Sequence, residues 1–212
     1  MENITIIIPI NEYSEDLKNF LDLAIDSINN QKNKPSNVLA VGPSEVLKNY
    51  NLDSNIEKVF NENDTDYCSQ INKAVDSVKT KYFSILAIDD QYNEKWFSNV
   101  EKYISYMPEY SVYAPIVNLI DKEGDIVGTI NELGWAMSFV EGNNLGEINE
   151  KCLQAYYDFS VNGAVFRTDD FIEVGKLKPS IKLAFWYEYL LRATNQGMKI
   201  YVIPKNGYYH YI

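Results

Sequence analysis

Two adjacent carboxylates, Asp89 and Asp90, are the residues whose type and position most clearly suggest chemistry. They directly follow a mostly apolar run at 82–88, which is typical of a buried strand. Hard divalent cations take oxygen ligands and bridge phosphate oxygens, so carboxylates at the end of such a strand suit a phosphorylated ligand. An Asp pair after a strand is also common in turns and helix caps. The pair therefore predicts a metal-assisted nucleotide site, with a structural turn as the alternative.

The chain is strongly acidic, with a net charge of -11 over 212 residues. Its length suits one generous domain, and its hydrophobic fraction of 46% is ordinary for a soluble globular protein. The average surface would repel nucleic acid and anionic membranes, so neither is expected as the main partner. A phosphate ligand would need local help from a metal or from a few basic side chains, which agrees with the carboxylate pair.

The two cysteines, Cys68 and Cys152, lie far apart and lack the spacing of metal ligands. Neither a disulfide scaffold nor a zinc site is expected, so a reducing, cytoplasmic location is the default. The apolar run at 4–10 is too short for a membrane span and lacks the basic start of a signal peptide. No later run reaches the length of a transmembrane helix, so we expect no membrane span.

The pattern of residues 1–93 alternates between strand and helix. Strands are predicted at 4–10, 37–41, 56–60 and 82–88, and helices at 14–31, 44–50 and 67–78. This alternation is typical of a parallel, doubly wound α/β sheet. Ligands of such sheets bind beyond the carboxyl ends of the strands, where Asn11, Gly42 and Asp89 would cluster.

The pattern of residues 94–212 is different and contains more hairpin signals. The predicted elements are a helix at 94–106, strands at 111–118 and 126–130, a loop at 131–150, a strand at 159–167, a short helix after 168, a helix at 184–195 and a last strand at 199–204. We expect this half to accept a second ligand on top of the first half.

Four segments, taken in their order, resemble the GT-A fold glycosyltransferases of the family 2 type. The segments are ITIIIPINE, NKAVDSVKTKYFSILAIDD, VNGAVFRTDDFIEVG and YEYLLRATNQGMKIYVIP. The resemblance implies a single GT-A-type α/β domain over 1–212, with a Rossmann-like, mostly parallel central sheet flanked by helices. Residues 1–93 would bind the nucleotide sugar and residues 94–212 would form the acceptor side. The implied activity is metal-dependent, inverting transfer of a hexose from a nucleotide sugar, expected to be a UDP-sugar, to a glycan or small hydroxyl acceptor.

The resemblance also implies which residues hold the donor. The base and ribose would lie against Pro9, Ile10, Asn11 and Glu12. Asn72 would sit near the nucleotide, and Gly42 falls at about the place of the family's base-binding Asp, which leaves the preferred base open. Assembly into a homo-oligomer also stays open.

The metal, Mn²⁺ or Mg²⁺, would be held by Asp89, which matches the second carboxylate of the family's DxD motif. Asp90 follows that motif directly, and Ala87 replaces its first carboxylate, so the site has one acidic ligand fewer than usual. His210, the only histidine, is a third candidate ligand because some GT-A enzymes add a His near the chain end to the metal. A packing role is the alternative for His210.

The catalytic base is the largest departure from the family. The family's acidic pair aligns with Phe185 and Trp186, and neither can take a proton from an acceptor hydroxyl. Glu188 and Asp158 are the candidate substitutes, with an exposed helix carboxylate and a turn residue as the alternatives. A catalytically silent module that still binds a nucleotide sugar or a glycan is therefore the second hypothesis. A nucleotidyltransferase is disfavoured because no Gly-rich basic loop follows the first strand.

Overall fold

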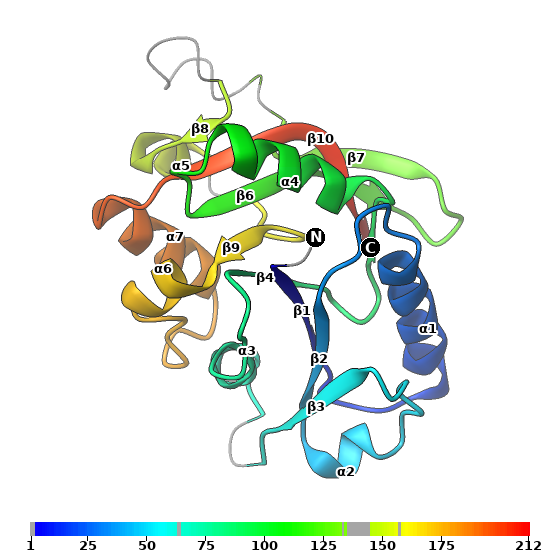
Figure 1. The fold of residues 1–212 in the computed structure, drawn as a ribbon. Helices are drawn as coiled ribbons and strands as arrows, with labels where there is room; N and C mark the ends of the chain where they lie inside the picture. Colours follow the sequence, from blue (N-terminus) through cyan, green and yellow to red (C-terminus); the bar gives the residue numbers. More distant parts are fainter. Residues whose placement is uncertain (1–2, 63–64, 133, 135–144, 157) are drawn as a thin grey trace.

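A computed structural model describes residues 3–62, 65–132, 134, 145–156 and 158–212. Figure 1 shows an α/β fold in which helices flank one large sheet. The strands are β1 (Ile4–Pro9), β2 (Asn37–Gly42), β3 (Ile56–Phe60), β4 (Tyr82–Ile85), β5 (Gln91–Tyr92), β6 (Val112–Ile120), β7 (Ile126–Ile130), β8 (Glu147–Ile148), β9 (Val165–Arg167) and β10 (Ile200–Tyr211). The helices are α1 (Glu15–Asn29), α2 (Ser44–Leu47), α3 (Tyr67–Val75), α4 (Trp96–Tyr106), α5 (Glu150–Ala155), α6 (Thr168–Glu173) and α7 (Phe185–Asn195).

The first four strands form the parallel half of the sheet, in the order β3-β2-β1-β4. Strand β1 lies inside this half, and its residues from Ile4 to Ile8 are all buried. A continuous β-branched run fits this position, because a parallel strand is covered by helices on both faces. The predicted parallel, doubly wound arrangement of the first half is confirmed.

The second half continues the same sheet in the order β4-β9-β6-β10-β5, with mixed directions. Strand β9 pairs antiparallel with both β4 and β6, and β10 runs parallel to β6. The hairpin partner β7 and the short β8 pair with β6 and β10 at the side of this path. One continuous sheet therefore joins the donor-side and acceptor-side halves that the sequence predicts.

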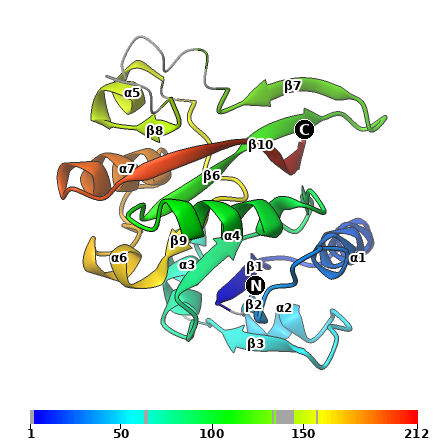
Figure 2. The same cartoon turned by 45° about the horizontal axis from the view of Figure 1, so that its top comes forward.

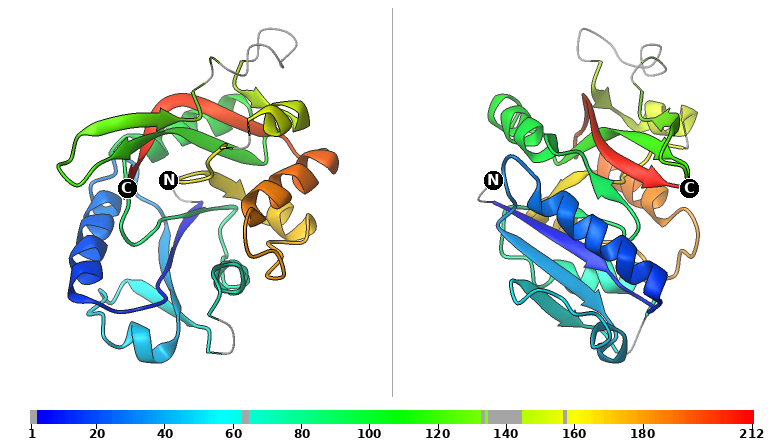
Figure 3. Two further views of the ribbon diagram at one scale, coloured as in Figure 1. Left: turned by 180° about the vertical axis from the view of Figure 1, so that it is seen from behind. Right: turned by 90° about the vertical axis from the view of Figure 1, so that its right-hand side faces the viewer.

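Two apolar cores cover the two faces of the sheet. Side chains from α3, α5, α6 and α7 pack on one face, and side chains from α1, α2 and α4 pack on the other. Figures 2 and 3 show α4 lying across the strands of the second half and α1 beside those of the first. No helix in the described part of the chain is both long and apolar enough to cross a membrane.

Three predicted strands differ from the observed ones by more than two residues in length. The predicted strand at 82–88 leaves the sheet after Ile85, and a turn closed by the Asp90 amide on the Ala87 carbonyl (3.2 Å) follows. The predicted strand at 159–167 is regular only over Val165–Arg167, because Gly163 adopts a left-handed φ of 71°.

The last strand is longer than the predicted 199–204 and runs to Tyr211. Its register against β6 shifts twice, between Val202 and Asn206 and between Asn206 and Tyr208. These irregularities accommodate Pro204 and the polar residues after it, so that β10 pairs with β6 again beyond them. The predicted loop at 131–150 also contains an unpredicted strand, β8, and the start of α5.

Candidate functional site

The carboxyl ends of the parallel strands bring the predicted donor-binding residues to one edge of the sheet. Ile10 donates its backbone N–H to the Val41 carbonyl at 2.8 Å, which holds the segment after β1 against the end of β2. A Cβ at Gly42 would lie 2.0 Å from the Ile10 carbonyl oxygen, so only glycine permits this contact. Tyr50 donates its hydroxyl to the Glu12 carbonyl at 2.9 Å and fixes the next turn.

The four residues after and at the end of β1 differ in exposure. Pro9 is half-buried and Ile10 is buried, whereas Asn11 and Glu12 are exposed. A ligand could therefore reach the side chains of Asn11 and Glu12, whereas Ile10 and Gly42 are buried. Their contact with a nucleotide stays a prediction.

Asp89 lies in the turn after β4 and is half-buried. Burial raises the pKa of its carboxyl, and the neighbouring Asp90 carboxylate raises it further. A second carboxylate so close would destabilise the ionised form unless a positive charge compensates. A cation beside Asp89 would relieve this repulsion.

Asp90 is buried beneath the last strand, with its side chain 0% exposed. Its two carboxylate oxygens lie 3.1 and 3.0 Å from Nδ1 of His210. The backbone N–H of Tyr211 also donates to Oδ1 of Asp90, at 3.0 Å. The hydrogen bond between His210 and Asp90 raises the pKa of His210, with smaller contributions from the charges of Asp90 and Asp89. The structure thus brings two of the three predicted metal ligands, His210 and Asp90, into contact, and the charge of Asp89 acts on the same imidazole.

Tyrosines from the same strand enclose this carboxylate. The Ala87 amide donates to the Tyr208 hydroxyl at 3.1 Å, and Gln91 donates to the Tyr211 hydroxyl at 3.0 Å. Burial raises the pKa of Tyr208 well above its ordinary value, and the Asp90 charge raises it further, so this phenol stays neutral. Tyr208 and Tyr211 are not among the residues predicted from the sequence, although the tyrosine-rich segment at 208–211 favours a strand.

Asn72 is engaged with the loop after α6. Its side-chain amide donates to the Leu177 carbonyl at 2.8 Å and accepts from the Leu177 amide at 3.0 Å. Both polar ends of the amide therefore hold protein backbone. This gives Asn72 a structural role, and its predicted position near the nucleotide stays a prediction.

A small pocket lies beside Ala87, where the family would have its first metal-binding carboxylate. Its volume is about 250 Å³ with the space open to solvent included, and its lining consists of Tyr67, Ile85, Ala87, Val161, Asn162, Trp186 and Tyr208. Trp186 stacks on Phe166 with ring centroids 5.3 Å apart and planes 19° apart, so its indole is held in place. The pocket is lined by aromatic and neutral side chains, which suits the apolar face of a sugar.

Glu188, the first candidate base, is tied into an ion-pair cluster. Nε and Nη2 of Arg192 donate to its two carboxylate oxygens at 2.7 and 3.0 Å, and Nζ of Lys178 lies 2.9 Å from Oε1. Arg192 also donates to the carbonyls of Val174 and Lys176. The hydrogen bond from Arg192 is the main cause of a lowered pKa at Glu188. A carboxylate in this setting is a weak base.

Asp158, the second candidate base, is exposed in the loop before β9. Its negative charge contributes to a raised pKa of Tyr156, after burial. Asp158 and Glu188 both stay predictions as catalytic residues.

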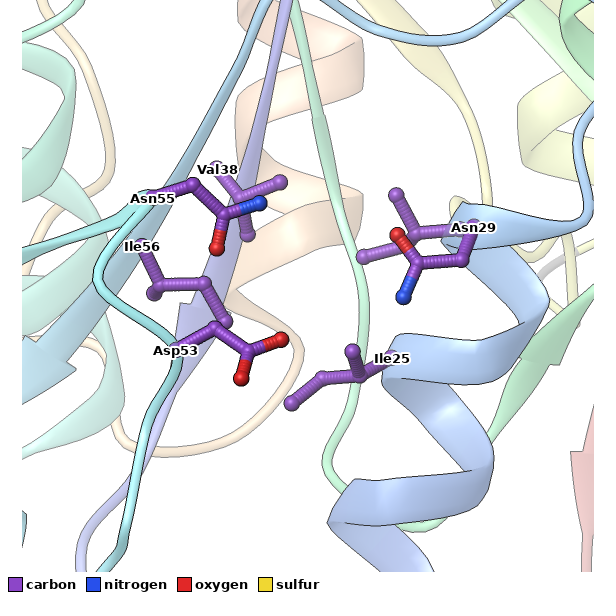
Figure 4. A pocket seen from close by; sticks show the side chains of 7 residues that line it. Ile25, Asn29, Val38, Asp53, Asn55 and Ile56 are labelled. Carbon is purple, nitrogen blue, oxygen red and sulfur yellow. The ribbon is translucent and has the colours of Figure 1, made fainter.

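Another cavity, of about 230 Å³ with open space included, lies between α1 and the starts of β2 and β3. Figure 4 shows Ile25 and Asn29 of α1 facing Val38, Asp53 and Ile56 across it. This cavity is at the amino ends of the parallel strands. Ligands of such sheets bind at the opposite edge, so this cavity is not the candidate site.

The donor atoms at the carboxyl edge fit a divalent cation shared with a ligand. Within the described ranges, no three His, Cys, Asp or Glu side chains lie close enough together to hold a metal on their own. Asp89 and Nε2 of His210 supply one hard oxygen donor and one nitrogen donor, a mixture that Mn²⁺ accepts. A cation held by two protein ligands would take its remaining ligands from phosphate oxygens and water.

Comparisons with known proteins bear on the fold. No protein-family profile matches the sequence, and no curated protein sequence matches it. Among solved structures, crystal structures of S. aureus TarS residues 1–349 in complex with UDP and with UDP-GlcNAc both match with a TM-score of 0.72, 13% identity and 99% of this chain covered. The match covers 60% and 58% of those two chains. A longer TarS structure matches with a TM-score of 0.70 and 14% identity, with 37% of its length covered.

This chain therefore spans less than two thirds of the TarS structures that it matches. At this identity the likeness concerns the fold, and it extends over nearly all of this chain. The chain has the fold of S. aureus TarS, a GT-A-like glycosyltransferase, as the four sequence segments predict.

Proposed function

We propose that this protein is a glycosyltransferase that moves a hexose from a UDP-sugar to a hydroxyl group of a glycan or small acceptor. The observation that carries the proposal is the contact of His210 with Asp90 in the segment after β4, the strand that pairs with β1, on a fold shared with TarS. TarS has been crystallised with UDP and with UDP-GlcNAc. A nucleotide sugar is therefore the natural first ligand to test.

A divalent cation, Mn²⁺ or Mg²⁺, would be held by Asp89 and by Nε2 of His210. When bound, such a cation neutralises the charge that develops on a departing nucleoside diphosphate. The protein's own part would be to present Asp89 from the turn after β4 and His210 from β10. The prediction that Asp90 ligates the cation directly is less well supported, because its oxygens already accept hydrogen bonds from His210 and Tyr211.

The acceptor would enter beside Trp186 and Asn162, in the pocket next to Ala87. In the proposed reaction the acceptor oxygen attacks C1 of the donor sugar, and the bond from C1 to the diphosphate oxygen breaks. The diphosphate leaves with the electron pair, and attack from the opposite side inverts the anomeric centre. The acceptor proton must pass to a base, for which Asp158 and Glu188 are the candidates. The ion pairs of Glu188 disfavour it.

The same features support a second function, a silent module that binds a nucleotide sugar or a glycan without turnover. Trp186 stands where the family has a catalytic carboxylate, and it is held by stacking on Phe166. A neutral aromatic pocket can bind a sugar but cannot take a proton. Turnover of the donor distinguishes this module from an enzyme.

The test is the melting temperature of the protein with a panel of nucleotide sugars, each with Mn²⁺ and with a chelator. A ligand at 100 times its Kd adds about 2.7 kcal/mol to the free energy of unfolding, which raises the melting temperature measurably. We expect one UDP-sugar to stabilise the protein only when Mn²⁺ is present. Asp89→Ala should abolish that stabilisation, and Asp22→Asn, an exposed acid on α1, is the matched control.

Hydrolysis or transfer of the stabilising donor, followed by release of UDP, then separates the two functions. Turnover establishes the transferase, whereas metal-dependent binding without turnover establishes the silent module. If no nucleotide sugar stabilises the protein, both the transferase and the silent module that binds a nucleotide sugar are contradicted.

A further inference from the structure

Asp90 and His210 form a contact that the proposed metal chemistry does not explain by itself. The Asp90 side chain is completely buried, whereas the His210 side chain is 35% exposed. The imidazole therefore has one edge against a buried carboxylate and the other edge toward solvent. Its Nδ1 edge faces Asp90, with distances of 3.1 and 3.0 Å to the two oxygens.

The chemistry of these groups fixes the proton on the neutral ring. An ionised carboxylate only accepts hydrogen bonds, so the nitrogen that faces it must carry the hydrogen. With the hydrogen on Nδ1, the lone pair is on Nε2. No described residue forms a hydrogen bond with Nε2, and the charge of Asp89 is close enough to act on the same ring. The lone pair of Nε2 is thus not used by any described residue.

We infer that Asp90 is a positioning residue for the proposed metal site: it selects the Nδ1–H tautomer of His210 and orients its Nε2 toward a cation shared with Asp89. The inference rests on the proposed function. It replaces direct ligation by Asp90 with an indirect action through His210. Partners of this kind behind a histidine ligand are worth about 10–100-fold in metal affinity.

The Tyr211 backbone makes the inference testable with one substitution. Its N–H donates to Oδ1 of Asp90 at 3.0 Å, so in Asp90→Asn the carbonyl oxygen of the new amide must face this donor. The NH₂ group of the amide then takes the place of Oδ2, 3.0 Å from Nδ1 of His210, and donates to a ring whose hydrogen is on Nε2. The amide oxygen, 3.1 Å from Nδ1, still accepts from a ring whose hydrogen is on Nδ1. The variant keeps the shape of the side chain and removes the preference for one tautomer.

The experiment uses the fact that His210 is the only histidine of the chain. The ¹⁵N shifts of its ring report the tautomer directly, at a pH where the ring is neutral and without any metal. We expect the wild type to carry the hydrogen on Nδ1, Asp90→Asn to show both tautomers, and Asp89→Asn to match the wild type. Titration with Mn²⁺, alone and with UDP, should broaden the ring signals of the wild type at concentrations about 10–100-fold lower than in Asp90→Asn.

The two variants separate the inference from the proposed function. Asp89→Asn removes a direct ligand, so it should weaken Mn²⁺ binding while it leaves the tautomer unchanged. A wild-type ring with its hydrogen on Nε2 overturns the role of Asp90 even if Asp90→Asn fails to fold. An Asp90→Asn variant with wild-type Mn²⁺ affinity overturns it as well. Absence of Mn²⁺ broadening in the wild type contradicts the proposed metal site, while the tautomer measurement still decides what Asp90 does.

Discussion

At the scale of single residues, the neighbours of a carboxylate decide what it can do. Glu188 sits between Arg192 and Lys178 and has a lowered pKa, whereas Asp89 sits against another carboxylate and has a raised one. Their sequence contexts do not distinguish them, because both follow a mostly apolar run. The contrast indicates a structural clamp at Glu188, whereas metal binding by Asp89 stays a prediction.

Glu188→Gln should lower the free energy of unfolding near neutral pH by about 1–2 kcal/mol, because charge-assisted hydrogen bonds to a mostly buried carboxylate are lost. The folded-state pKa of Glu188 is lowered, so its contribution is complete above the ordinary Glu pKa of about 4.3 and disappears as the pH falls through the lower folded value. Urea titrations at neutral and acidic pH should therefore show the gap between wild type and variant closing in acid.

Glu57→Gln, at an exposed position on β3, is the control and should change the free energy of unfolding little at either pH. A Glu188→Gln variant that keeps full stability but loses turnover would contradict the clamp and favour Glu188 as the catalytic base.

At the scale of elements, the segments with strong local signals could be predicted from the sequence. The β-branched run of β1 and the amphipathic pattern of α1 behind its Ser14 cap specify their own structure, and the Ser14 hydroxyl accepts the Leu17 amide at 3.1 Å. Strand β10 could not be predicted in full, because its continuation to Tyr211 depends on pairing with β6, far away in the sequence. His210 and Asp90 could therefore each be named as candidates, whereas the contact between them could not be predicted.

The loop between α5 and β9 is another element that distant contacts determine. Its anchor is the buried Asn131, which donates to the carbonyls of Pro115 and Ser160 at 2.9 and 2.8 Å and accepts from the Ser160 amide at 3.0 Å. Trp96 also donates its indole N–H to the Gly163 carbonyl at 2.8 Å. No local pattern specifies these bonds, so the expected strand at 159–167 is a loop over most of its length. The result is that Asn162 is held at the pocket.

Gly163→Ala should lower the free energy of unfolding by about 2–4 kcal/mol, since it adds left-handed strain and overpacking together. The backbone φ is 71°, and a new Cβ would lie 2.5 Å from the Tyr208 ring. Gly124→Ala is the matched control, because its φ of 88° is similar but nothing lies within 4 Å of the new Cβ. It should cost about 1 kcal/mol, from strain alone. Equal losses in urea titrations of the two variants would show that the Tyr208 contact is unimportant.

At the scale of the whole molecule, the predicted donor and acceptor sides share one sheet and the apolar cores on both of its faces. Ile7 of β1 belongs to the same apolar cluster as Phe166 of β9 and Tyr189 of α7, and β4 hydrogen-bonds to β9 across the boundary between the halves. A division at about residue 93 would expose both partners of this pairing. Neither of the two halves predicted from the sequence therefore has a complete core of its own, and their roles in binding stay predictions.

Ile7→Ala should test this unity, because it removes a completely buried side chain from the donor-side half. We expect the free energy of unfolding to fall by about 2–5 kcal/mol, as for other large-to-small changes in a core. All three tryptophans of the chain lie in the acceptor-side half, at 96, 135 and 186, so their fluorescence follows that half alone. If the sheet unfolds as one unit, urea titrations followed by tryptophan fluorescence and by far-ultraviolet circular dichroism should shift together. A fluorescence transition that stays at its wild-type midpoint, while circular dichroism shows an earlier step, would mean that the acceptor side folds on its own.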